Sequence, residues 1–137
     1  STTSCLDWDE SKLDREEGEY VGKIVTLCRK NGINIVLTTV VQDPDTVAEK
    51  CSGFAQADAY FSNLAAQLDV KYLNFNKLKF DVLDRTTDDF YDKEGHMYGD
   101  MAEKFSAVCA KAVKEAIADT LNEEYYFDKD MSNLYKK

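Results

Sequence analysis

The sequence predicts an α/β fold in which helices pack on both faces of a parallel sheet. Helical and extended patterns alternate along the chain, which is the order typical of such sheets. The run from Ile33 to Val41 is almost continuously apolar and β-branched, as expected of a strand covered on both faces. The 137 residues, 44% of them hydrophobic, suffice for one core but not for two ordinary domains. We therefore expect residues 1–137 to form a single domain or part of one.

The first helix is expected from about Ser11 to Asn31. Ser11 with Asp14 three residues later resembles an N-terminal cap, and Asn31-Gly32 is a stop signal. Four apolar residues recur at helical spacing and are expected to face a core. They are Tyr20, Ile24, Leu27 and Cys28.

The strand from Ile33 to Val41 is followed by the only proline, Pro44, and a polar connection is expected to continue to about Gly53. Loops at the carboxyl ends of strands are where open α/β sheets usually build sites. A second helix is expected from about Ala55 to Leu68. Its apolar stripe comprises Ala57, Tyr60, Phe61, Leu64, Ala65 and Leu68.

A short second strand is expected from Lys71 to Phe75, followed by a helical turn within residues 76–83 and an acidic loop from Asp84 to Gly95. The last long helix begins near Tyr98 or Gly99. Its inward-facing residues are Ala102, Phe105, Cys109, Ala112, Val113, Ala116 and Ile117.

The tail, residues 122–137, mixes aromatic and charged side chains. Its aromatic residues are expected to anchor it to the core, and stacking on sugar rings is the alternative.

Two strands are too few to close a sheet, because open edges leave backbone groups unpaired. We therefore expect further strands from a segment absent here, from another subunit, or from the stretches before Ser11 and after Asn122. The two terminal stretches are the poorer source, since they are polar and aromatic rather than β-branched. The chain is thus expected to be an incomplete α/β unit.

Charge excludes two classes of partner. Seventeen basic and twenty-six acidic residues give a net charge of -9, which repels phosphate backbones and anionic lipid. No nucleic acid and no membrane contact is expected. Ser1 to Glu10 lack the regions of a signal peptide, so secretion is absent or the signal has been removed.

The four cysteines have no C-x-x-C spacing, and a single histidine accompanies them, so no structural zinc is expected. Cys28 and Cys109 fall on apolar helical stripes and are expected to be buried free thiols. Cys5 and Cys51 lie in polar connections, where both the bridged and the free state remain open.

The only histidine, His96, lies at the junction between the acidic loop and the last helix. An imidazole steered by a carboxylate can act as a general base, whereas a solvated or cap-bonded histidine is the plainer interpretation. The loop lacks the Asp-x-Asp-x-Asp-Gly order of an EF-hand, so its carboxylates are interpreted as solvated. They are Asp84, Asp88, Asp89, Asp92 and Glu94.

The stretch Asp88–Ser106 resembles the last conserved block of the SGNH (GDSL-type) hydrolases and their O-acyltransferase relatives. Phe90-Tyr91-Asp92 with His96, and then Ala102 to Ser106, carry the resemblance. The order of elements extends it over about Leu13 to Ala118. The resemblance implies a three-layer, flavodoxin-like SGNH fold, no cofactor or metal, and an extracytoplasmic location.

In that family a serine attacks an ester, a histidine takes its proton, and an aspartate orients the histidine. The resemblance therefore implies that His96 is the general base and Asp92 its orienting acid. The family's acid usually lies three positions before the histidine, where this chain has Lys93, so Asp89 and Glu94 are alternatives. The resemblance further implies an esterase or O-acyltransferase acting on acyl groups of carbohydrate or cell-envelope polymers, with an acylated carbohydrate or small ester as substrate.

The pattern also departs from the family. Tyr98 and Met101 replace an asparagine and a glycine, and neither a Gly-Asp-Ser nor a Gly-x-Asn-Asp block occurs. Without a nucleophile and an oxyanion hole the mechanism cannot run. The chain is thus expected to supply the histidine and aspartate of a triad whose serine is elsewhere, or to be a non-catalytic module on a degenerate scaffold. Four serines are interpreted as surface or capping residues: Ser4, Ser52, Ser62 and Ser106.

Overall fold

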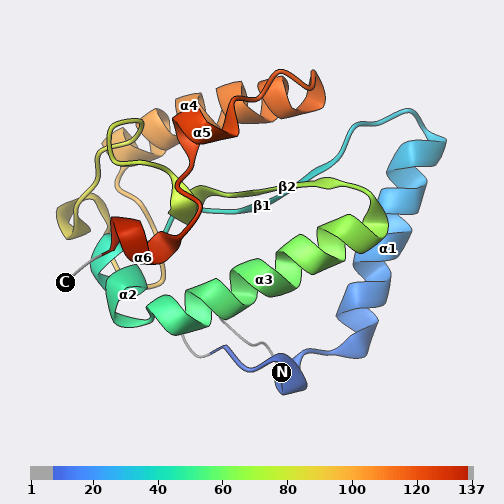
Figure 1. The fold of residues 1–137 in the computed structure, drawn as a ribbon, viewed down its shortest axis with the longest axis horizontal. Helices are drawn as coiled ribbons and strands as arrows, with labels where there is room; N and C mark the ends of the chain where they lie inside the picture. The colour runs from blue at the N-terminus through green and yellow to red at the C-terminus, as the bar shows by residue number, and fades with distance from the viewer. Residues whose placement is uncertain (1–7, 136–137) are drawn as a thin grey trace.

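The structure is a computed structural model that describes residues 8–135 (Figure 1). Within these residues the fold is mixed α/β, with six helices around a two-stranded parallel sheet. Strand β1 (Val36–Thr39) pairs with β2 (Lys71–Asn74). The predicted alternation of helices and parallel strands is confirmed at this level.

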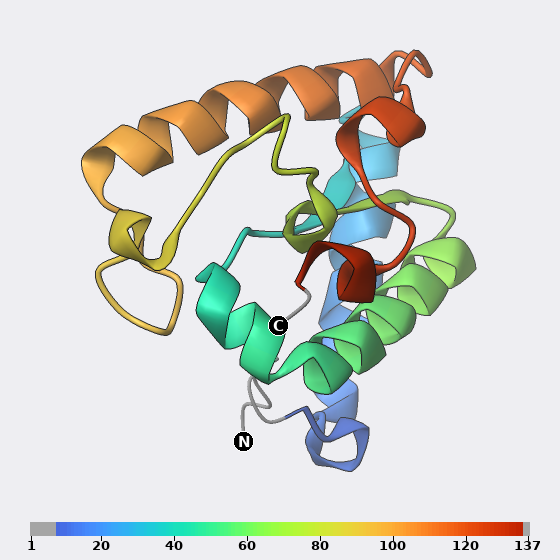
Figure 2. The ribbon, with the colours of Figure 1, turned by 60° about the vertical axis from the view of Figure 1, so that its left-hand side comes forward.

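Helices cover both faces of the sheet. Helix α3 (Cys51–Leu68) connects the strands and lies on one side, while α4 (Gly99–Ile117) lies on the other (Figures 1 and 2). Neighbouring residues of a strand point to opposite faces. Tyr72 accordingly lies beside Phe61 of α3, whereas Leu73 joins the core under α4. That core also contains Val41, Phe75, Leu78, Leu83, Phe90, Met101, Phe105, Ala112, Ala116 and Tyr126.

Helix α1 (Arg15–Lys30) begins at Asp14, whose side chain accepts a hydrogen bond from the N–H of Glu16 at 2.9 Å. It follows a short 3-10 turn, η2 (Glu10–Lys12), and ends at Asn31 with Gly32 at a φ of +66°. Arg29 donates hydrogen bonds to the backbone at the end of α3, so α1 packs across that end. The predicted stop is confirmed, while the cap is Asp14 rather than Ser11.

The predicted apolar stripe of α1 does not face the core. Tyr20, Ile24 and Leu27 are 56%, 53% and 61% exposed, whereas Val25 is 1% exposed. Only a narrow side of α1 is covered by the rest of the described chain. On that side Val25 is buried, Gly22 and Cys28 are half-buried, and Arg29 bonds to the end of α3. A broad apolar face is therefore left in solvent.

The polar connection predicted after β1 is wrong, because a helix forms there. Helix α2 (Pro44–Glu49) begins at Asp43, whose side chain accepts from the N–H of Thr46 at 3.0 Å. Proline at the first helical position is compatible with a helix, since its missing N–H is not needed there. Asp43-Pro44 is thus a start signal, and α3 begins only one residue after α2 ends.

Strand β1 is shorter than predicted and is not covered throughout. Ile33, at the start of the predicted strand, and Val40, one residue before its end, are exposed, whereas the last residue, Val41, is buried. Beyond β2, the turn η3 (Phe75–Lys77) leads to Leu78, which forms an antiparallel bridge with Phe127 of the tail. No described residue pairs with β1 on the edge away from β2. No further strand of the described residues pairs with the outer edge of β2 either, since the bridge at Leu78 lies beyond that strand, so both edges of the sheet are open.

The tail is anchored, as predicted. It contains α5 (Glu123–Tyr126) and α6 (Met131–Leu134). Tyr126, Met131 and Tyr135 are buried, so these side chains anchor the tail to the core. On α4, Phe105, Ala112 and Ala116 are buried as predicted and Ala102, Cys109 and Val113 are half-buried, but Ile117 is exposed and that assignment is wrong.

Cys28, Cys51 and Cys109 are free thiols and are half-buried, so the predicted full burial of Cys28 and Cys109 is wrong. Burial raises the pKa of the Cys109 thiol. Cys5 lies outside the described residues. Among residues 8–135, no helix combines the length and the apolar character needed to cross a membrane.

Candidate functional site

The histidine lies on a short two-stranded loop. The turn η4 (Thr87–Asp89) precedes it, and Phe90 and Met97 then form an antiparallel bridge. The N–H of Tyr91 donates to the carbonyl of His96 at 2.8 Å. Gly95 closes the loop at a φ of +95°, a conformation that side chains with a Cβ rarely adopt. The backbone therefore fixes where the imidazole leaves the chain.

Asp92 holds the imidazole. Its Oδ2 lies 2.6 Å from Nδ1 of His96. Its Oδ1 accepts from the N–H groups of Glu94, at 2.9 Å, and His96, at 3.2 Å. The carboxylate is thus bound on both oxygens, and with Nδ1 donating to it, Nε2 is the basic nitrogen. An orienting acid requires this geometry.

The hydrogen bonds also keep Asp92 ionised. Partial burial raises the pKa of this carboxyl, but the N–H and imidazole of His96 and the N–H of Glu94 lower it by more. The net result is a pKa below the ordinary value of 3.8. Asp92 is therefore a carboxylate at neutral pH and can stabilise an imidazolium.

Aromatic rings flank the exposed side of the imidazole. The ring of Tyr91 lies 5.7 Å from that of His96, and 6.2 Å from that of Tyr98. Both tyrosines are exposed, and His96 itself is exposed. In the described residues, Asp92 is the only side chain hydrogen-bonded to the imidazole. The basic Nε2 is thus accessible from outside.

Contacts at the end of β1 seat the loop. A Cβ on Gly95 would overlap Oε1 of Gln42, so the Gln42 side chain packs directly on the glycine. Thr87 donates to Oδ1 of Asp43 at 2.7 Å. The N–H of Gln42 in turn donates to Asn76 at 2.8 Å, beyond the end of β2. The histidine loop is therefore held at the carboxyl edge of the sheet.

Sequence reasoning identified His96 and Asp92 but missed the residues that seat them. Gln42, Asp43 and Thr87 lie more than forty positions from their partners in the loop or in α2. The one available signal was their place just after an apolar strand, where sites usually form.

Neither alternative acid is hydrogen-bonded to the imidazole. Asp89 accepts from the N–H of Thr86 at 2.8 Å and caps η4. Glu94 contributes its N–H to Asp92, and its side chain is exposed. Asp92, Glu94 and His96 offer ligand atoms within 4.8 Å of one another, the donor types a divalent cation accepts. The imidazole and Asp92 are already hydrogen-bonded to each other, however, and the group faces solvent.

None of the candidate serines that the structure describes serves as a partner of the imidazole. Ser52 and Ser62 lie on α3 and Ser106 on α4, and all three are exposed. Ser4 lies outside the described residues. None of the three described serines is hydrogen-bonded to His96.

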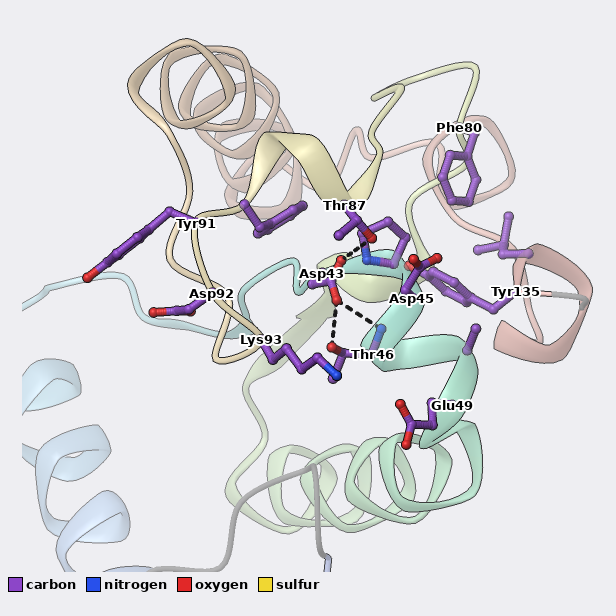
Figure 3. A pocket seen from close by; sticks show the side chains of 14 residues that line it. Asp43, Asp45, Thr46, Glu49, Phe80, Thr87, Tyr91, Asp92, Lys93 and Tyr135 are labelled. Carbon is purple, nitrogen blue, oxygen red and sulfur yellow. Dashed lines mark hydrogen bonds between the residues drawn. The ribbon is translucent and has the colours of Figure 1, made fainter.

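A cavity of about 790 Å³ adjoins the loop, on the side of Asp92 (Figure 3). Residues of α2, the segment from Thr87 to Lys93, Phe80 and the tail residues Leu134 and Tyr135 line it, and its remaining side is open to solvent. It opens where β1 ends and α2 begins.

The chain was also compared with known proteins. It matches no family model, no curated protein and no solved structure.

Proposed function

We propose that this chain is the C-terminal portion of an SGNH-like esterase or O-acyltransferase and supplies the histidine and aspartate of a Ser-His-Asp triad. The observation that carries the proposal is the pair Asp92–His96, with Oδ2 and Nδ1 2.6 Å apart. The pair lies at the carboxyl edge of a parallel sheet, where such chemistry is usually built.

The geometry supports a defined role for each residue. Nε2 of His96 takes the proton of the attacking serine and gives it to the leaving alcohol. It then takes a proton from water or the acyl acceptor and returns that proton to the serine as the acyl group leaves. Asp92 holds the imidazole by Nδ1 and stabilises its protonated form. The serine and the oxyanion donors belong to the segment that completes the domain. No metal or organic cofactor takes part in this mechanism.

The complete fold in this proposal is the three-layer, flavodoxin-like SGNH arrangement. Support comes from the unpaired edge of β1 and from the exposed stripe on α1. A further parallel strand against β1, with its own helix on Tyr20, Ile24 and Leu27, would cover both. That strand belongs to a preceding segment or to another subunit, and it carries the nucleophile.

The substrate class follows from the same resemblance. We infer an acyl group on a carbohydrate or cell-envelope polymer, since the family's relatives act on such esters. The net charge of -9 argues against nucleic acid and anionic membrane surfaces as partners.

The test uses the completed protein, with the chain joined to or co-expressed with its nucleophile-bearing segment. Hydrolysis of p-nitrophenyl acetate should fall by about 10²–10⁴-fold in His96→Ala, and substantially in Asp92→Asn. Glu94→Gln is the matched control, because it removes a neighbouring carboxylate that is not hydrogen-bonded to the imidazole. Unchanged turnover in His96→Ala would remove the histidine from the mechanism.

The chain alone should show no triad-type esterase activity, because no described serine is bonded to His96. A serine-dependent burst of acylation from the pure chain would contradict the proposal. If the completed protein has no esterase activity, the second candidate applies, a non-catalytic binding or assembly module. The exposed stripe on α1 is the observation that favours that candidate.

A further inference from the structure

The cavity beside Asp92 has the size and position of a ligand site. Its volume of about 790 Å³ falls in the range of about 300–1,000 Å³ that small-molecule sites occupy. It lies between α2, the histidine loop and the end of the tail (Figure 3). Thr87 donates to Asp43 and so joins the histidine loop to the start of α2. Tyr135 joins the tail to Asn76, whose carbonyl accepts from its hydroxyl at 2.6 Å and whose side chain accepts from the N–H of Gln42. Hydrogen bonds therefore hold the segments that line the cavity in place.

The lining combines aromatic walls with unused acceptors. Phe80 and Tyr135 form one side, and Tyr91 stands at the other (Figure 3). Asp45 and Glu49 project from α2 into the space between. Within the described residues, neither carboxylate makes a side-chain hydrogen bond or an ion pair, so both are open to a ligand.

The charge of the lining is negative. Four carboxylates line the cavity, namely Asp43, Asp45, Glu49 and Asp92, against one lysine, Lys93. Hydrogen bonds hold the pKa of Asp43 and of Asp92 below the ordinary value, so both remain charged at neutral pH. An anionic ligand would be repelled here.

The cavity lies behind the catalytic pair rather than at the reacting atoms. Asp92 forms part of its wall, whereas His96 does not. Since Nδ1 faces Asp92, Nε2 lies on the far side of the ring from that carboxylate. A ligand bound in the cavity is thus separated from the ester that Nε2 would serve.

We propose that this cavity is a subsite for a neutral or cationic sugar ring of the acylated glycan, one unit removed from the ring that carries the ester. Sugar hydroxyls donate to carboxylates such as Asp45 and Glu49, and the C–H faces of the ring pack on aromatic side chains. Uronic acids are excluded by the negative lining. This inference rests on the proposed function for its place in catalysis, but the binding itself does not require the nucleophile.

The test is a titration of the ¹⁵N-labelled 137-residue chain with three trisaccharides, followed by NMR. Tri-glucosamine and tri-N-acetylglucosamine should shift the amides of α2 and of residues 87–93, with the cationic sugar binding more tightly, and trigalacturonate should shift none. Asp45→Asn with Glu49→Gln should weaken binding by about tenfold or more, because the sugar hydroxyls lose two charged acceptors. Glu103→Gln, an exposed change on α4, is the control.

Three outcomes would overturn the subsite. These are no shift with either neutral or cationic sugar, equal binding of trigalacturonate, and shifts unaffected by the double variant. The readout separates this proposal from the proposed function, because His96→Ala should leave sugar binding intact. Binding without His96-dependent hydrolysis would refute the catalytic proposal alone, and hydrolysis without binding would refute the subsite alone.

Discussion

Gly95 is the residue on which the shape of the histidine loop depends. Its φ of +95° and the Gln42 side chain, which occupies the place a β-carbon would take, leave no space for alanine. Gly95→Ala should lower the free energy of unfolding by about 1 kcal/mol or more and displace the imidazole. Urea unfolding and the imidazole NMR resonances measure the two effects.

The control for this change is Gly18→Ala on α1, where a Cβ meets nothing within 4 Å. Alanine should raise the free energy of unfolding there by about 0.5–1 kcal/mol, because glycine is a poor residue inside helices. Adding Gln42→Ser to Gly95→Ala removes the clash but not the backbone strain, so it should recover only part of the loss. Full stability of the single Gly95→Ala variant would show that the loop is not seated by this contact.

The ionisation of Asp43 should make the free energy of unfolding depend on pH in the acid range. Burial raises its pKa, but hydrogen bonds from Thr46 and Thr87 outweigh burial, and the pKa lies below the ordinary 3.8. A lowered folded-state pKa gives stability that is complete above 3.8 and is lost as the pH falls through the lower value. The free energy of unfolding should therefore drop below pH 3.8, and less steeply in Asp43→Asn. Asp45→Asn, at an exposed neighbouring carboxylate, should leave the slope nearly unchanged.

The pairing of Asp92 with His96 could be predicted from the sequence, because the two residues lie four positions apart within one motif. It did not predict Gln42 or Thr87, because their contacts join segments that only the folded sheet brings together. Local spacing holds no information about such pairs.

Among the elements, the tail depends on one buried hydroxyl. Tyr135 accepts from Arg85 at 2.7 Å and donates to the carbonyl of Asn76 at 2.6 Å. Tyr135→Phe should cost about 1–3 kcal/mol of unfolding free energy, because the Asn76 carbonyl loses this donor. The Arg85 guanidinium loses one acceptor but still donates to the carbonyls of Leu78 and Leu83. Tyr125→Phe, at an exposed ring in the same tail, should change stability by no more than about 0.5 kcal/mol. Thermal or urea unfolding of both variants measures the difference, and equal effects would show that the anchor is purely apolar.

Element types were predictable where one pattern dominated, as in α1, α3, α4 and the two strands. Helix α2 was missed because Pro44 was interpreted only as a breaker, although Asp43 before it supplies the cap that a helix start requires. The inward side of α1 was mispredicted for a different reason. Tyr20, Ile24 and Leu27 form a genuine stripe, but periodicity cannot show which neighbour covers it.

For the whole molecule, the exposed stripe and the open edge of β1 predict an effect that depends on the partner. In the chain alone, Ile24→Glu with Leu27→Lys should change stability by no more than about 0.5 kcal/mol per site, because both side chains face solvent. In the completed protein the same pair should prevent association or abolish activity. Val25→Ala, at the buried position of the same helix, should destabilise both forms. Co-purification and sedimentation measure association, and unimpaired assembly of the double variant would exclude this face.

The contact between Gln42 and Gly95 connects β1, whose outer edge is unpaired, to the loop that carries the imidazole. Gln42 lies just past β1, so a neighbour that adds to the sheet aligns the same backbone on which the histidine loop rests. Any strand that pairs with β1 would therefore act on the orientation of the imidazole through this single side chain.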